Sequence, residues 1–270
     1  ADDNPDSPTS ALALMQAANG LVASVLAELG RLVAPGVSTL DLDEVAERHV
    51  RDAGAVPAFK GYNGYPSTLC ASVNDAVVHG IPSATPLVEG DIVSLDMGVV
   101  LDRFYGDSAV TVPVGQVADR TMDLLRVTRR SLELAIEQMQ VGGHVSDIGH
   151  AVQRHVEANG FAVVREFVGH GIGVTLHEEP QIPNYGESGR GPALAAGMVF
   201  AIEPMVTMGA PAVKVLQDGW TAVTRDGSLA AHFEHTVAVT DAGPQVLSQI
   251  MEADAVADVM TREPASLPHG

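Results

Sequence analysis

The chain has 270 residues, of which 46% are hydrophobic and 18% charged, and its formal net charge is −19. This composition supports a sizeable core and excludes a disordered chain, while the single cysteine, Cys70, excludes an intramolecular disulfide. The acidic surplus disfavours binding to nucleic acid and to anionic membranes. The first ten residues have neither the basic region nor the apolar stretch of a secretory signal. We therefore expect a cytoplasmic protein with neither nucleic-acid nor membrane partners.

Two helices are predicted near the N-terminus. After an acidic tail at 1–10, residues 10–32 have the apolar spacing of a helix, which the sequence "PGVST" ends. Thr39 or Asp41 is suitably placed to cap a second helix. The following segment, 55–90, is rich in Gly, Pro, Tyr and Asn and predicts loops with short strands.

The rest of the chain predicts a hairpin, two more helices and further strands. Residues 91–115 predict two strands joined by a turn near Leu101–Arg103, and amphipathic helices are expected over 118–140 and from Ser146 to Gly160. Segregated helices and strands favour an α+β fold over a βαβ winding. The expected β segments are 161–168, 197–203, 212–216 and 230–240, and the expected organisation is one domain over 11–250 with a C-terminal tail at 251–270.

Two aspartates lie in the predicted hairpin. If the turn is centred between Leu101 and Asp102, Asp96 and Asp107 lie directly opposite one another. Like charges in that position destabilise a buried sheet unless one carboxyl is protonated or a cation lies between them. The alternative is a register shifted by one residue, which turns one aspartate toward solvent.

Two glutamates have similar apolar surroundings. Glu203 ends the run "GMVFAIEP", and Glu234 precedes a β-branched run in "AAHFEHTVAVT". Either one alone is more commonly a residue at a strand end or edge than a ligand. Four such acids with a nearby imidazole fit a site for divalent Mn, Fe, Co or Zn better than they fit a zinc site built from thiolates. Four negative charges also suit a pair of divalent ions better than one ion.

Five segments together resemble a known family. They are "NGYPSTLCASVNDAVVHGIP" (63–82), "DIVSLDMGVVLDRFYGDSA" (91–109), "GHGIGVTLHEEP" (169–180), "MVFAIEP" (198–204) and "HFEHT" (232–236). In this order and spacing they resemble the type I methionine aminopeptidases over roughly residues 12–250. The resemblance implies a pita-bread (creatinase/aminopeptidase) fold, with pseudo-two-fold halves and a central antiparallel sheet covered by helices. It also implies a metallo-exopeptidase that removes the initiator methionine from nascent proteins and prefers a small second residue.

The resemblance assigns five metal ligands: Asp96, Asp107, His170, Glu203 and Glu234. It implies that Asp107 and Glu234 bridge two divalent ions, that Asp96 chelates one ion, and that His170 and Glu203 bind the other. A water molecule activated by the ions is then the nucleophile, and Glu203 carries its proton toward the leaving amine. The identity of the ions, among Co, Mn, Fe and Zn, stays open.

Two histidines have implied catalytic roles. His177 is expected to donate a hydrogen bond to the scissile carbonyl as it becomes an oxyanion, and His79 to contact the substrate amide from the other side. The glycines at 169, 171 and 173 are expected to let the backbone pass close to the metals. Structural roles are assigned to the remaining histidines, with His235 the best candidate for supporting a ligand: His49, His144, His150, His155, His232, His235 and His269.

The pocket for the methionine side chain is expected to be apolar. Phe59 and Leu176 depart from the bacterial pattern, in which a smaller residue and an aromatic residue are common at these positions. Both departures concern substrate tolerance and not the reaction itself. The implied lining residues are Tyr62, Tyr65, Cys70, Trp220, Phe59 and Leu176.

Two other functions stay open at this point. One is an X-Pro aminopeptidase or prolidase of the same fold, which uses a similar ligand set. The other is a catalytically inactive pita-bread protein that acts as a binding module. The signatures "HGIP", "GHGIG" and "HEEP" favour the methionine enzyme, and the complete ligand set disfavours an inactive protein. The expected partner is the N-terminal peptide of a nascent protein, and the expected state is a monomer.

Overall fold

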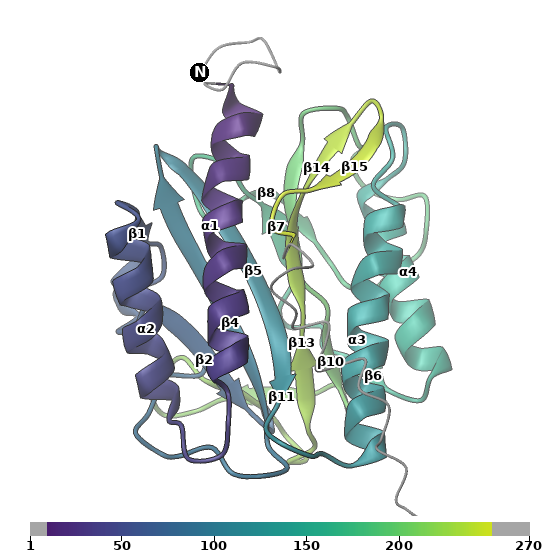
Figure 1. Ribbon diagram of the computed structural model, residues 1–270. Helices are drawn as coiled ribbons and strands as arrows, with labels where there is room; N and C mark the ends of the chain where they lie inside the picture. Colours follow the sequence, from purple (N-terminus) through teal and green to yellow (C-terminus); the bar gives the residue numbers. More distant parts are fainter. Residues whose placement is uncertain (1–9, 250–270) are drawn as a thin grey trace, which may run out of the picture.

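A computed structural model describes residues 10–249 and begins with two helices that cover one half of a sheet (Figure 1). These helices are α1 (Ala11–Leu32) and α2 (Thr39–Asp52). At the start of α2 the Ser38 amide donates to the Asp41 carboxylate at 2.9 Å, and the Asp41 amide donates to Ser38 Oγ at 3.1 Å. Neither predicted cap was right, because Ser38 is the N-cap and Asp41 is its reciprocal partner.

Helices α3 (Asp119–Glu137) and α4 (Val145–Ala158) cover the other half of the sheet. Helix α1 packs on β4 (Ile92–Leu101) and β5 (Phe104–Pro113), whereas α3 packs on β9 (Val199–Ile202) and β14 (Glu234–Thr240) and α4 on β8 (Glu178–Ile182). Helix α4 begins one residue earlier than expected, because the His144 amide donates to the Asp147 carboxylate at 2.7 Å and caps the helix there.

The strands form one large sheet and two small ones. The order in the large sheet is β1-β4-β5-β14-β9-β7-β8, with β2 added on β4 and β15 on β14, and its pairs are antiparallel. Its members are β1 (Val56–Pro57), β2 (Leu69–Val73), β4 (Ile92–Leu101), β5 (Phe104–Pro113), β7 (Gly169–Gly171), β8 (Glu178–Ile182), β9 (Val199–Ile202), β14 (Glu234–Thr240) and β15 (Gly243–Val246). The small sheets contain β13 (Ala230–His232), β10 (Met205–Thr207) and β6 (Ala162–Val163), and β11 (Val213–Val215), β12 (Ala222–Thr224) and β3 (Ala76–Val78).

The two halves of the molecule join where β5 pairs with β14. Each half contributes two helices to the same face of the sheet (Figure 1). This arrangement confirms the expected pita-bread α+β fold, and the main core fills the space between helices and sheet. The predicted boundaries at 11 and 250 stay predictions, and the predicted tails lie outside the described residues except for Ser10.

Helix α1 is long and apolar enough to cross a membrane by length and composition, yet 50% of its most apolar window is buried inside the protein. The buried Asn19 helps to hold α1 against the sheet. The Asn19 Oδ1 accepts a hydrogen bond at 3.2 Å from the backbone amide of Asp107 in β5. The first helix of the chain therefore anchors the strand that carries a predicted metal ligand.

The hairpin of β4 and β5 has a different register from the one predicted. Its turn residues are Asp102 and Arg103, with φ of 48° and 75°, so the turn is centred one residue later than expected. As a result Asp96 lies opposite Ala109, and Asp107 lies opposite Gly98. The observed partner of Asp96 is thus two residues away from the predicted one. Because the offset is even, both aspartates stay on one face of the sheet and neither turns to solvent.

The strand prediction also missed part of the sheet. Only Ala162–Val163 is a strand within the predicted segment 161–168, whereas β7 and β8 occupy 169–182, where no strand was expected. Glycine and acidic residues have low strand propensity. In this segment pairing with β9 outweighs that propensity.

Candidate active site

Five neighbouring strands of the large sheet each place one predicted ligand at the same region. Asp96 lies in β4, Asp107 in β5 and Glu234 at the start of β14, while Glu203 directly follows β9 and His170 is the central residue of β7. Because the strands are neighbours in the sheet, residues separated by up to 138 positions in sequence become adjacent in space.

The strand register brings the carboxylates together. Ala109 of β5 lies opposite Asp96 on one side and opposite Glu234 on the other. Asp107 is two residues from Ala109 and therefore points to the same face. In the same way Ala201 lies opposite His170, and Glu203 is two residues further along the chain. The sheet thus presents all five side chains on one face.

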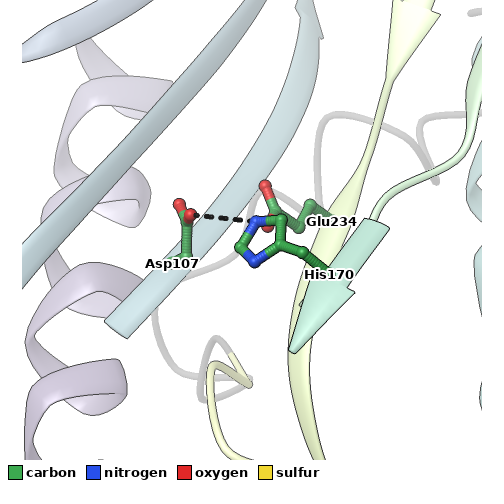
Figure 2. Close-up of side chains that lie close together, drawn as sticks. All are labelled: Asp107, His170 and Glu234. Carbon is green, nitrogen blue, oxygen red and sulfur yellow. Dashed lines mark ion pairs between the residues drawn. The ribbon is translucent and has the colours of Figure 1, made fainter. Parts of the chain in front are cut away.

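The members of the resulting cluster lie close together, as Figure 2 shows for three of them. One ligand atom from each of Asp107, His170 and Glu234 lies within 4.8 Å of the others. The Nε2 of His170 is 3.9 Å from Asp107 Oδ2 and 3.5 Å from Glu203 Oε1. Asp96, Asp107, His170 and Glu234 are buried, whereas the Glu203 side chain is 14% exposed.

Three carboxylate oxygens of the cluster lack a partner among the residues that the structure describes. Among residues 10–249, Asp96 Oδ1, Asp107 Oδ1 and Glu234 Oε1 are buried and have no hydrogen-bond partner, which is costly for a carboxylate. Burial raises the pKa of Asp96 to about 7. Burial, reinforced by the neighbouring carboxylates, raises the pKa of Asp107, Glu203 and Glu234 well above their usual range. Oxygen ligands of this kind fit a divalent cation.

His170 is prepared to act as a nitrogen ligand. Its Nδ1 lies 2.9 Å from the carbonyl oxygen of Gly171. Because a carbonyl can only accept, that nitrogen carries the proton, and Nε2 presents a lone pair toward Asp107 and Glu203. Burial lowers the pKa of His170 to about 4, so the ring is neutral at physiological pH. A lone pair facing two carboxylates is the arrangement expected when a cation lies between them.

The two predicted catalytic histidines lie at the same site. His177 immediately precedes β8, its ring centroid is 4.3 Å from that of His170, and its Nδ1 is 2.8 Å from the Tyr62 hydroxyl. His79 directly follows β3 and has a left-handed backbone with φ of 59°, an uncommon conformation for a residue other than glycine. Burial, with a smaller effect of His177, lowers the pKa of His79 to about 4. Both side chains line the same cavity as the carboxylates.

A family model for metallopeptidase family M24 matches residues 13–241. The chain belongs to metallopeptidase family M24. It is 49% identical over 239 residues to methionine aminopeptidase 1 of Bacillus subtilis, covering 88% of this chain and 96% of that protein. The crystal structure of methionine aminopeptidase from Thermotoga maritima superposes with a TM-score of 0.88 at 46% identity, covering 90% of this chain and 98% of that one.

More distant solved structures share the fold alone. The prolidase from Pyrococcus furiosus has a TM-score of 0.70 at 20% identity, and the match covers 87% of this chain and 63% of that one. The close similarity to methionine aminopeptidases identifies this M24 protein as a metallo-aminopeptidase that uses divalent metal.

The M24 site opens into a cavity of about 320 Å³ that all the predicted pocket residues line. The Tyr65 hydroxyl donates toward the carbonyl oxygens of Leu69 and Gly80 at 3.0 and 2.9 Å, and its ring packs edge-on against Trp220 at 5.1 Å. Cys70 is a free, buried thiol, and burial raises its pKa well above the usual range. The thiol is therefore neutral and acts as an apolar lining group.

The departures at Phe59 and Leu176 are part of the pocket wall of this M24 protein. Both line the cavity, and both also belong to a small apolar cluster that includes Met15 of α1 and Leu247. Leu176 is a buried member of that cluster, and Phe59 packs against it. Their packing fixes this side of the pocket, so the wall is an extension of the core.

The structure adds two residues to the predicted M24 site. Asn63 lines the cavity within a tight turn in which its φ is 47°. His232, assigned a structural role from the sequence, is buried with Nε2 4.0 Å from Glu203 Oε2. The sequence contained one signal for His232, its position two residues before Glu234, because alternate residues of an extended segment point to one face.

Glu178 has a structural role beside the site. Its Oε1 accepts hydrogen bonds from the amides of Val174 and Thr175 at 2.9 and 3.0 Å. These bonds close the loop that joins β7 to β8. The loop carries His177, so Glu178 supports the site of the M24 protein without lining its cavity.

The glycines of β7 allow this strand to lie close to backbone atoms of the neighbouring strands. A Cβ on Gly169 would lie 2.4 Å from the carbonyl oxygen of Ala201. We expect Gly169→Ala to lower the free energy of unfolding by about 1–3 kcal/mol through overpacking. Gly20 in α1 is the control, because a Cβ there meets no atom within 4 Å, and Gly20→Ala should stabilise the helix by about 0.5–1 kcal/mol. Chemical denaturation measures both, and unchanged stability of Gly169→Ala contradicts the packing argument.

Metal binding should release protons at neutral pH. Burial raises the pKa of Asp96 to about 7 and that of Asp107 well above its usual range, so the metal-free cluster retains protons at pH 7 that cation binding must displace. We therefore expect metal affinity to rise as pH increases from 6 to 8. Titration calorimetry in buffers of different ionisation enthalpy measures the protons released. Heats that are independent of the buffer would contradict the raised pKa values.

Proposed function

We propose that the protein removes the N-terminal methionine from nascent chains whose second residue is small, and that the cluster holds two divalent ions. One observation carries the proposal: a single cavity is lined by all five predicted ligands, both predicted catalytic histidines and the apolar pocket. Four carboxylates with raised pKa values balance the charge of two divalent ions better than that of one.

The proposed ligands are Asp96, Asp107, His170, Glu203 and Glu234. When bound, divalent cations supply Lewis-acid stabilisation and lower the pKa of a water molecule. The side chains of Asp107 and Glu234 lie centrally in the row of strands, between Asp96 in β4 and the pair of Glu203 and His170. This position supports the bridging role proposed for these two carboxylates.

Glu203 is suited to move a proton. Its pKa is raised well above the usual range, first by burial and then by Asp107, so the carboxyl takes up a proton more readily than an exposed glutamate does. Its Oε1 faces the cavity beside His170 Nε2. In the proposed reaction Glu203 accepts a proton from the attacking water and delivers it to the leaving amine.

His177 and His79 are suited to hold the scissile peptide. Burial lowers the pKa of His177 below its ordinary value and that of His79 to about 4, so both rings are neutral. A neutral imidazole can donate a hydrogen bond to a carbonyl oxygen through its one N–H. In the proposed reaction His177 stabilises the developing oxyanion, and His79 contacts the substrate amide from the opposite wall.

The pocket selects the side chain that is removed. Tyr65, Trp220, Phe59 and Leu176 present apolar surface, and the buried Cys70 thiol completes a wall without a charged group. An unbranched thioether matches such a lining, whereas a charged side chain would lose its hydration without a partner.

A peptide series tests this specificity directly. Peptides X-Ala-Ser, with X being methionine, norleucine or lysine, should be cleaved in the order methionine, norleucine, lysine, with lysine below detection. Met-Ala-Ser should also be cleaved faster than Met-Trp-Ser if the second residue must be small. Equal cleavage of the lysine peptide would overturn the proposed role of the pocket.

The proposal also covers where the protein acts. A buried free thiol supports a reducing compartment such as the cytoplasm. The monomeric state and the lack of nucleic-acid and membrane partners stay predictions from the sequence.

A further inference from the structure

A buried histidine, His232, lies behind the cavity. It has no role in the reaction proposed above. The His232 side chain is 1% exposed, and neither of its ring nitrogens has a hydrogen-bond partner among residues 10–249. A buried imidazole without a partner loses the hydrogen bonds that it made to water, which costs stability. Such a residue needs an explanation other than core packing.

The backbone of His232 is fixed from two directions. Its amide donates to Thr111 Oγ1 at 2.9 Å, and its carbonyl oxygen accepts from the same hydroxyl at 2.7 Å. It is also the partner of Met205 in the pairing of β13 with β10. The ring therefore extends from a rigid position at the edge of the site.

The ring is directed at Glu203, which lies between two imidazoles. Glu203 Oε1 is 3.5 Å from Nε2 of His170 on the cavity side, and Glu203 Oε2 is 4.0 Å from Nε2 of His232 on the interior side. The imidazole ring of His232 has an N–H donor in either tautomer.

We propose that His232 is a positioning residue that donates its Nε2–H to Glu203 Oε2 and thereby holds Oε1 toward the cavity. The two atoms are 4.0 Å apart, so the proposed bond requires the Glu203 side chain to rotate toward His232. A donor behind a ligating carboxylate fixes its orientation, and loss of such a partner costs about 10–100-fold in metal affinity or activity. This inference rests on the proposed role of Glu203 as ligand and proton carrier.

Two substitutions at this position separate positioning from packing. His232→Leu removes the donor and fills most of the space, whereas His232→Gln places a carboxamide N–H at a similar distance from the backbone. We expect the leucine variant to bind Mn²⁺ about 10–100-fold more weakly by titration calorimetry. Its kcat for Met-Ala-Ser should fall with little change in KM, and the glutamine variant should recover both metal affinity and kcat.

His155 provides a matched control. Its Nε2 is also buried without a partner among the described residues, but it lies in α4 and does not line the cavity. His155→Leu should leave Mn²⁺ affinity and kcat unchanged. Equal losses in the leucine and glutamine variants of His232, or full metal affinity in the leucine variant, would overturn the proposal.

A measurement on the unsubstituted protein keeps the inference testable if His232→Leu does not fold. Nitrogen NMR shifts of the His232 ring in the Zn²⁺-loaded protein report which nitrogen carries the proton. We expect protonated Nε2 and unprotonated Nδ1, and a proton on Nδ1 alone contradicts the proposed donor. If instead the unsubstituted protein binds metal with this tautomer but does not cleave Met-Ala-Ser, the proposed function fails and the positioning role stands.

Discussion

Replacing Asp107 by asparagine is expected to reduce turnover by roughly a thousandfold or more, which corresponds to about 4 kcal/mol of lost transition-state stabilisation. Asp107 is central in the row of ligands, and its carboxylate is buried beside His170 and Glu234. The amide removes one negative charge, so we expect the stoichiometry of bound Mn²⁺ or Co²⁺ to fall as well. Metal analysis by atomic emission and steady-state cleavage of Met-Ala-Ser measure both effects.

The fold of the Asp107→Asn variant should survive. The backbone amide of residue 107 donates to Asn19 and its carbonyl accepts from Thr236 Oγ1 at 2.8 Å, and neither bond involves the side chain. Asp102→Asn in the turn of the same hairpin is the control, because asparagine tolerates its left-handed backbone. Full turnover and full metal content in Asp107→Asn would exclude the proposed bridging role.

Replacing His177 by alanine should lower kcat by about 10²–10³-fold and leave metal content unchanged. The ring of His177 contacts that of His170 but provides no atom to the cluster of Asp107, His170 and Glu234. Its expected interaction is with the carbonyl oxygen as charge develops, so KM should change much less than kcat.

The control for His177 is His150→Ala on the exposed side of α4, which should retain wild-type kinetics. Thermal unfolding of both variants shows whether a loss of rate reflects unfolding. An unchanged kcat in folded His177→Ala removes the oxyanion role. A loss confined to KM instead assigns the residue to substrate binding alone.

The helices were predictable from sequence because their signals are local. Apolar spacing and capping residues lie within one segment, so α1 to α4 were expected within a few residues of their observed bounds. The errors at Ser38 and His144 are shifts of one to three residues in the cap position. Each arises because the reciprocal acceptor, Asp41 or Asp147, lies three residues after the true cap.

The register of the hairpin was not predictable to the same accuracy. Its turn requires positive φ at Asp102 and Arg103, and arginine gives no signal for that conformation. The error of two residues preserved the face of Asp96 and Asp107, so the inference of a shared cation survived a wrong pairing. An error of one residue would have removed it.

The predicted site residues come together only through long-range strand pairing. His170 and Glu234 are brought together by β7, β9 and β14, and β7 itself lacked strand propensity. The resemblance to a family supplied these residues where local patterns did not. It gave no role to His232, because that role depends on a contact with Glu203 that only the folded chain reveals.

The most direct test of the central claim is one assay with two peptides. The protein is stripped with a chelator, Mn²⁺ or Co²⁺ is restored separately, and Met-Ala-Ser and Arg-Pro-Pro are offered under identical conditions. We expect metal-dependent release of methionine from the first peptide and no cleavage of the second. Cleavage of the proline peptide alone, or no cleavage of either peptide with metal shown to be bound, would contradict the proposed activity.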